Sequence, residues 1–180
     1  MKWMIASDIH GSELFCRKLL DAYCTEKADR LLLLGDILYH GPRNDLPEGY
    51  NPKKVIELLN DRKNDILCVR GNCDTEVDQM VLAFPIMAEY ALLTVSDRII
   101  FATHGHRFNE QNLPPLHDGD VLLHGHTHIP GCVRHETYVY MNPGSVSIPK
   151  ENSYHGYMTV ENNVFFWKDL DGTVKNQYIL

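Results

Sequence analysis

The nine residues WMIASDIHG at positions 3–11 join an apolar strand to two side chains that bind metal ions, Asp8 and His10. The same arrangement recurs in LLLLGD at 31–36 and in VLLHGHTH at 121–128. Each apolar run is typical of a buried parallel strand. Where a strand continues to its end, residues two apart point the same way, so Asp8 and His10 can serve one site.

The position of these side chains favours a metal-dependent hydrolase. Open α/β sheets place their active sites at the carboxyl ends of the strands, which is where the three stretches put their carboxylates and imidazoles. The last stretch holds a second pair of ligands spaced by two, His126 and His128. We therefore expect these stretches to meet at a site for two metal ions.

Length and composition predict a single domain over residues 1–180. The chain is long enough for a proper hydrophobic core, and its 44% apolar content is typical of a folded globular protein. No apolar run approaches the roughly 20 residues that span a bilayer, so we expect no membrane partner. A candidate ligand at position 8 argues against a removable signal peptide, and we expect a cytoplasmic protein.

The cysteine content indicates the redox state of the thiols, and the net charge limits the classes of binding partner. The five cysteines are odd in number and show no CxxC spacing, which indicates reduced thiols. The formal net charge of −7 argues against duplex DNA or an anionic membrane as a partner. A small phosphate substrate stays compatible, because bound divalent ions would make the site itself positive.

The first half of the chain alternates strands and helices. Strands are expected at 3–6, 31–34 and 66–69. Helices are expected from a cap at Ser12 to about residue 25, from about residue 52 to residue 60, and after a cap at Asp74 or Thr75. Residues 40–52 are rich in Pro, Gly and Asn and predict a long loop.

The second half is rich in short β segments separated by turn residues. Strands are expected at 90–95, 98–103, 121–123, 131–135, 138–141, 156–160 and 164–168. Turns are expected at 96–97, 161–163 and 171–172. An alternating half followed by a β-rich half predicts two sheets packed face to face with helices outside.

Polar residues that bind metals follow the apolar runs in order. They are Asp8, His10, Asp36, Asn72, His104, His126 and His128. Taken singly, each aspartate would be interpreted as a helix cap and Asn72 as a turn residue. Several independent ligand types in one order favour a metal site. Mixed nitrogen and oxygen ligands leave Mn²⁺, Fe²⁺, Zn²⁺, Co²⁺ and Ni²⁺ open.

The order DIH, GD, GN, HGH and GHTH resembles the calcineurin-like metallophosphoesterase superfamily over essentially the whole chain. The short length, together with GNCD at 71–74, THGH at 103–106 and NPGSVSIP at 142–149, is similar to the small bacterial phosphodiesterases of the YfcE type. The resemblance implies an α/β (α+β) fold, a four-layer αββα sandwich of two packed mixed sheets flanked by helices.

The resemblance also implies a reaction and a ligand set. Asp36 would bridge two divalent ions, with Mn²⁺ as the expected ion. The first ion would be completed by Asp8, His10 and His128, and the second by Asn72, His104 and His126. A hydroxide bridging the ions would attack the phosphorus of a small-molecule phosphodiester in line, without a covalent enzyme intermediate. Paired ions suit that role because they lower the pKa of bound water and neutralise phosphate oxygens.

Cys73 departs from the superfamily pattern, which usually has His after the Asn of GN. That His is thought to assist the leaving group or to stabilise the transition state. A thiol, with a reference pKa of about 8.5, can donate a proton but cannot carry positive charge. We therefore expect Asn72 and Cys73 to act at the reacting phosphate, on substrates whose leaving group needs little help.

Two further residues are candidates for substrate binding. Arg43 in the 40–52 loop could meet a phosphate, although an ordinary solvated arginine is the favoured interpretation. His106 could line the site or orient a metal ligand from behind. The turn at 142–145 is interpreted first as structural, and His124 as a core histidine.

Two other functions remain open from the sequence. A non-catalytic metal-binding scaffold for protein partners would share the fold, because fold does not fix function. A nuclease acting on short single strands would cleave the same kind of bond, but the acidic balance and the lack of an aromatic and basic stripe argue against nucleic acid. A homodimer is expected only because symmetric dimers are common.

Overall fold

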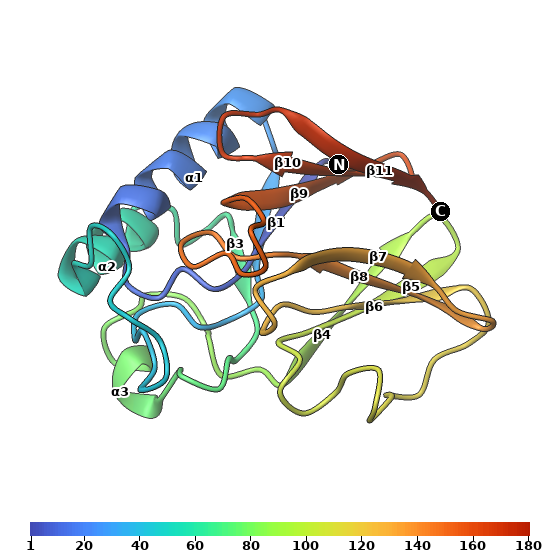
Figure 1. Ribbon diagram of the computed structural model, residues 1–180, viewed down its shortest axis with the longest axis horizontal. Helices are drawn as coiled ribbons and strands as arrows, with labels where there is room; N and C mark the ends of the chain where they lie inside the picture. Colours follow the sequence, from blue (N-terminus) through green and yellow to red (C-terminus); the bar gives the residue numbers. More distant parts are fainter.

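The computed structural model describes residues 1–180 as two β-sheets that pack face to face, with helices outside the first (Figure 1). The strands of the first sheet, in spatial order, are β11 (Val174–Ile179), β10 (Val164–Asp169), β9 (Gly156–Glu161), β1 (Trp3–Ala6), β2 (Arg30–Leu33) and β3 (Ile66–Cys68). Those of the second are β4 (Tyr90–Val95), β5 (Arg98–Thr103), β6 (Asp120–Leu123), β8 (Tyr138–Pro143) and β7 (Pro130–Arg134).

Both sheets are mixed, as expected from the sequence. In the first sheet β1 pairs parallel to β2 and β2 parallel to β3, whereas β9 runs antiparallel to β1. In the second sheet β6 lies parallel to both β5 and β8. The parallel strands of the two sheets supply the strand ends on which the candidate site is built.

Helices α1 (Glu13–Glu26) and α2 (Pro52–Asn60) begin where the sequence predicts them. The Ser12 hydroxyl accepts a hydrogen bond from the backbone N–H of Phe15, which caps α1. The Asn51 side chain caps α2, and Pro52 occupies the first turn, where its missing N–H costs nothing. None of the helices is long and apolar enough to cross a bilayer.

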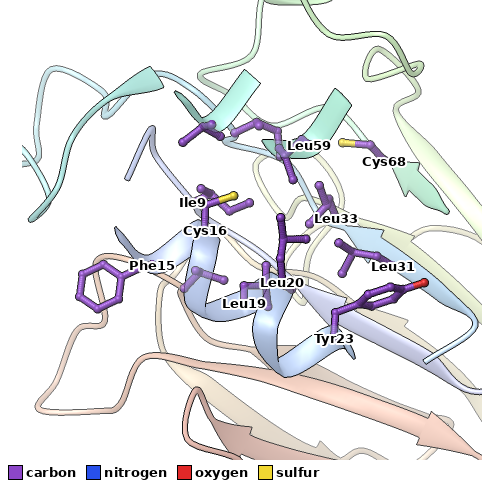
Figure 2. Packing of buried hydrophobic residues seen from close by; sticks show 14 of the residues in the cluster. Ile9, Phe15, Cys16, Leu19, Leu20, Tyr23, Leu31, Leu33, Leu59 and Cys68 are labelled. Carbon is purple, nitrogen blue, oxygen red and sulfur yellow. The ribbon is translucent and has the colours of Figure 1, made fainter. Parts of the chain in front are cut away.

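The central strands are apolar on both faces because each face packs against a different layer. Figure 2 shows Leu19 and Tyr23 of α1 beside Leu31 and Leu33 of β2, on the helical side of the sheet. The intervening Leu32 belongs to a separate buried cluster between the two sheets. This alternation follows from the two-residue period of a strand and explains the continuous run LLLL.

The buried cluster between the two sheets also contains a hydrogen bond that joins one sheet to the other. Trp167 of β10 is 1% exposed, and its Nε1 donates a hydrogen bond to the backbone carbonyl of Asn142 in β8 at 2.7 Å. Ile5, Val121 and Met158 lie in the same cluster. An indole buried with its N–H satisfied fixes the spacing of the sheets near the site.

The helices flank the first sheet alone. On the outer face of the second sheet, Phe101 and Tyr140 form a small cluster against which Phe108 and Leu116 pack from the segment between β5 and β6. That segment contains no helix. The two packed mixed sheets with flanking helices confirm the expected fold class, and a loop takes the place of the fourth layer.

Two details differ from the sequence predictions. β11 was not expected, because its residues are mostly polar and exposed, as suits the edge of a sheet with no layer over it. The helix expected after residue 75 is a single turn, α3 (Glu76–Gln79), and its cap is Thr75. Asp74, the other candidate cap, points elsewhere, as described below.

A partly buried ion-pair group ties the end of α1 to the first sheet. The Glu26 carboxylate lies 2.6 Å from the Nζ atoms of both Lys2 and Lys168, and it accepts a hydrogen bond from the hydroxyl of Tyr157 at 2.9 Å. Burial opposes ionisation of Glu26, but the two lysines and the hydroxyl outweigh it and lower the pKa to about 2. This group therefore contributes stability only while Glu26 is ionised.

Candidate metal centre

All seven predicted ligands lie just beyond the carboxyl ends of strands. Asp8 and His10 follow β1, Asp36 follows β2 and Asn72 follows β3. The other three come from the second sheet: His104 follows β5, and His126 and His128 follow β6. The parallel strands of both sheets thus end at one place, and the side chains that the sequence separates by up to 120 residues meet there.

Strand alternation does not explain how the paired ligands converge, contrary to our expectation. β1 ends at Ala6 and β6 at Leu123, so both pairs lie in loops. Their backbones turn instead through the left-handed region, with φ of 60° at Asp8, 49° at His10 and 67° at His126.

Asp36 and His128 share this conformation, with φ of 57° and 63°. Non-glycine residues seldom adopt it, and each costs on the order of 1–2 kcal/mol. Five strained residues among seven candidate ligands indicate a site whose geometry is held for function by the surrounding structure.

The ligand atoms fall into two groups around the Asp36 carboxylate. In the first group, Asp8 Oδ1 lies 3.5 Å from His10 Nε2 and 3.3 Å from His128 Nε2. Asp36 Oδ2 lies 3.7 Å from His10 Nε2 and 3.5 Å from His104 Nε2, between the groups. This spacing allows one carboxylate to serve both groups.

The second group adds an amide and a second imidazole to His104. His104 Nε2 lies 3.0 Å from Asn72 Oδ1 and 3.2 Å from His126 Nδ1. His126 therefore presents Nδ1 to the centre, whereas His104 presents Nε2. Both groups match the two sets of ligands that the sequence resemblance implies.

The ring orientations of three histidines are fixed from behind. His10, His104 and His128 each donate from Nδ1 to a backbone carbonyl at 2.7 Å, those of Tyr39, Leu34 and Ile148 respectively. An imidazole that donates from Nδ1 keeps the lone pair of Nε2 for a metal ion. All three Nε2 lone pairs consequently point into the centre.

The centre fits divalent metal ions because its buried acceptors face one another without donors between them. His10 Nε2 and His128 Nε2 lie 3.3 Å apart, and Asp8 Oδ1 is buried without a hydrogen-bond partner. A cation among these atoms would satisfy all of them at once. Nitrogen and carboxylate oxygen donors together suit Mn²⁺, Fe²⁺, Co²⁺, Ni²⁺ and Zn²⁺.

The electrostatics of the centre also favour cations. Burial opposes the charge of Asp8, but the neighbouring imidazoles of His10 and His128 hold its pKa well below the usual range. Burial likewise opposes protonation of His104, yet Asp36 and Asp8 raise its pKa to about 9. The carboxylates thus stay ionised, and positive charge is stabilised beside them.

Asp74 supports the centre in a way that the sequence did not predict. Its carboxylate is 1% exposed and accepts hydrogen bonds from the backbone N–H groups of Asp36, Ile37 and Gly71 at 2.8, 2.9 and 2.8 Å. One side chain therefore ties the loop that carries Asp36 to the loop that carries Asn72. A carboxylate that accepts three backbone donors is strongly fixed in position.

The turn at 142–145, which the sequence analysis interpreted first as structural, supports the loops of other candidate ligands through two side chains. Asn142 Nδ2 donates to the Gly125 carbonyl at 2.9 Å, which holds the loop of His126 and His128. The Ser145 hydroxyl donates to the Asp8 carbonyl at 2.9 Å. The first contact fixes Gly125, which precedes the left-handed His126, and the second fixes Asp8, whose own backbone is left-handed.

Comparison with known proteins agrees with this arrangement. The family model for the calcineurin-like phosphoesterase superfamily domain matches residues 1–163. This chain belongs to that superfamily. Phosphodiesterase YfcE of Escherichia coli K12 is 48% identical over 164 residues, which is 91% of this chain and 89% of that protein. The probable metallophosphoesterase YsnB of Bacillus subtilis is 32% identical over 172 residues, 91% of this chain and 86% of that protein.

A solved structure of YfcE, described as a phosphoesterase from E. coli, superposes with a TM-score of 0.96. It is 46% identical, and the match covers 99% of both chains. The likeness extends through both sheets, so the phosphoesterase fold described above is shared in full.

The centre of this phosphoesterase opens into a polar cavity of about 440 Å³. Asp36, His126 and His128 form its floor, and Arg43 lines it as expected. Lys150 also lines the cavity, although the sequence analysis did not single it out. Its position after the turn at 142–149 carries no recognisable signal, because only the fold brings that turn over the metal ligands. Two cations therefore face the place where phosphate would bind.

The two remaining candidates occupy different positions. Cys73 lines the polar cavity, its backbone N–H donates to Asp36 Oδ1 at 2.8 Å, and Asn72 Nδ2 donates to its sulfur at 3.2 Å. His106 lies beside the centre, with its ring 5.4 Å from that of His104, but it does not line the cavity. Its Nδ1 is buried without a partner.

The protein surroundings of Cys73 favour the neutral thiol over the thiolate. Burial and the neighbouring Asp36 carboxylate both raise its pKa above the usual range. A neutral thiol is a poor metal ligand and a poor nucleophile. The chemistry left to Cys73 is the donation of a hydrogen bond or a proton into the cavity.

Proposed function

We propose that this chain is a phosphodiesterase that depends on two divalent metal ions. The observation that carries the proposal is the position of the Asp36 carboxylate between two groups of ligands, because neighbouring ions need a shared ligand of this kind. The relationship to Phosphodiesterase YfcE supports a diester as the substrate.

The ligand set that we propose is the one expected from the sequence. Asp36 is shared; Asp8, His10 and His128 complete the first ion, and Asn72, His104 and His126 the second. Bound there, the ions would neutralise charge on the phosphate and would lower the pKa of a water molecule so that it can act as the nucleophile. We propose Mn²⁺ as the ion, although the same donors accept Fe²⁺, Co²⁺, Ni²⁺ and Zn²⁺.

The chain itself binds and orients the substrate. Arg43 and Lys150 line the cavity above the centre and can pair with the phosphate oxygens that the ions do not hold. Asn72 Oδ1 faces His104 and one N–H of its Nδ2 is directed to the Cys73 sulfur, which leaves the second N–H to donate to a substrate oxygen in the same cavity. His106 is proposed to contact the substrate only when its ring turns toward the cavity, since the ring does not line it now.

Cys73 favours a diester over a monoester. A monoester of phosphate carries about −1.5 to −2 charges near neutral pH, more than the single charge of a diester. Its departing alkoxide also gains from a nearby imidazolium, which a neutral thiol cannot replace. We therefore propose that aryl or other diesters with good leaving groups are the preferred class.

The test is hydrolysis of bis(p-nitrophenyl) phosphate and p-nitrophenyl phosphate in parallel, first with the metal-stripped protein and then with Mn²⁺. We expect no turnover without metal, and diester turnover well above monoester turnover with it. Asp36→Asn should lose the activity, whereas Asp171→Asn, at an exposed turn, should keep it. Full activity in excess chelator would end the proposal, and silence of the folded protein with every ion would favour the scaffold function.

The setting of the enzyme is part of the proposal. We propose one domain over residues 1–180 and a cytoplasmic location, which the five free cysteines support. A homodimer stays a prediction that a measurement of mass in solution can check.

A further inference from the structure

A second cavity, here called the apolar pocket, shares the lining residue Cys73 with the polar cavity. Its volume is about 370 Å³, within the range of about 300–1,000 Å³ typical of small-molecule sites. Seven of its eleven lining residues are hydrophobic, against one of eleven in the polar cavity. The side chains that define it are Leu38, Tyr39, Tyr50, Ile56, Val77 and Val81.

The mouth of the apolar pocket leaves large hydrophobic side chains in water. Tyr39 is 43% exposed, Val77 69% and Val81 44%, and the neighbouring Met80 is 83% exposed. Isolated hydrophobic residues on a surface are ordinary, but three exposed ones that line one hollow, with Met80 beside them in sequence, are the arrangement of a binding site. A ligand that covered these side chains would gain hydrophobic free energy.

The apolar pocket adjoins the polar cavity of the metal centre at one residue, Cys73. Cys73 lines both cavities, so a molecule that spans them passes this one side chain. The carbonyl of Tyr39 accepts the hydrogen bond from His10 Nδ1 at 2.7 Å, which fixes the wall of the pocket to a candidate metal ligand. The ring of His40 packs edge-on against both Tyr39 and Tyr50, at 4.8 and 5.4 Å between ring centroids, and holds the two tyrosines in place.

We propose that the apolar pocket binds a flat aromatic ester group of a phosphodiester whose phosphate lies in the polar cavity. This assignment rests on the phosphodiesterase function proposed above, and it names the substrate class of that site. Lys53 and Asp78 are the charged residues of the pocket and have opposite signs, so a neutral group suits it. Two tyrosines favour an aromatic ring, through stacked or edge-to-face contact.

Binding of a ring can be measured without turnover. The probe is 4-nitroanisole, a neutral ring that carries no phosphate, titrated into the full chain loaded with diamagnetic Zn²⁺ and followed by amide chemical shifts. We expect the largest shift changes at residues 38–39, 50–56 and 73–81. We expect Val77→Asp and Val81→Asp to abolish them and Val174→Asp, at a valine 50% exposed on β11 outside the pocket, to leave them unchanged.

Kinetics then tie the pocket to the substrate. In Val77→Asp and Val81→Asp we expect KM for bis(p-nitrophenyl) phosphate to rise about tenfold, equivalent to about 1.4 kcal/mol. In the control Val174→Asp we expect KM to equal that of the unchanged protein. Shift changes elsewhere on the molecule, or an unchanged KM in both pocket variants, would overturn the assignment and leave the phosphodiesterase function standing. Absence of turnover in the unchanged protein with every ion would overturn that function and this substrate assignment with it.

Discussion

The substitution Asp74→Asn tests whether one buried carboxylate assembles the metal centre. Asp74 Oδ2 accepts from the N–H groups of Asp36 and Gly71, and Oδ1 accepts from that of Ile37. An asparagine side chain has only one oxygen atom. If that oxygen takes the position of Oδ2, the side chain keeps the hydrogen bonds from Asp36 and Gly71 and loses only the one from Ile37. Its NH₂ group then faces the N–H of Ile37, a residue that is fully buried.

The magnitude follows from that lost bond. A hydrogen bond to a charged group contributes about 1.5–3 kcal/mol, and a buried donor left unsatisfied costs about 1–3 kcal/mol. We therefore expect Asp74→Asn to lower the free energy of unfolding by about 2–4 kcal/mol. Because the bonds position the loop of Asp36, metal affinity should also fall, by about 10–100-fold as for other residues that support metal ligands.

The assays are urea denaturation of the metal-free protein and calorimetric titration with Mn²⁺. Asp171→Asn is the matched control, since Asp171 is exposed and its side chain makes no hydrogen bond in the structure. Its unfolding free energy and metal affinity should stay within about 0.5 kcal/mol of the original. If Asp74→Asn behaved like this control, the role of Asp74 in assembling the centre would be refuted.

Three further predictions concern other parts of the molecule. Cys73→His should raise the ratio of monoester to diester turnover, and an unchanged ratio would mean that the thiol does not set substrate preference. Glu26→Gln should be less stable to urea than the original at neutral pH. Because the folded pKa of Glu26 is lowered to about 2, this difference should persist above pH of about 4.5 and vanish as the pH falls toward 2, as a urea series across pH can check. Gly125→Ala should lose metal binding by calorimetry, because the added Cβ would clash with Ser7 Oγ and lie 2.7 Å from Asp8 Oδ2, whereas Gly172→Ala, with open space around it, should bind metal normally.

The chemistry of the site could be predicted from the sequence because it is local. Which residues can bind a metal is a property of the side chains themselves, and the apolar runs before Asp8, Asp36 and His126 already place them at strand ends. The same runs predict two-sided burial, which Leu31 and Leu32 bear out by packing into different clusters. Helix caps such as Ser12 are local as well, and α1 and α2 start where the sequence expects them.

Contacts between distant segments depended on the tertiary structure alone. Nothing in the sequence around Lys150 or Asp74 tells which loop each side chain will reach, since both contacts arise when separate strands pair. The left-handed backbone of Asp8 and His10 has the same origin: no local preference favours it, and the surrounding packing pays its cost. The sequence determined the candidate ligands, whereas long-range packing decided their conformation, their supports and the pockets beside them.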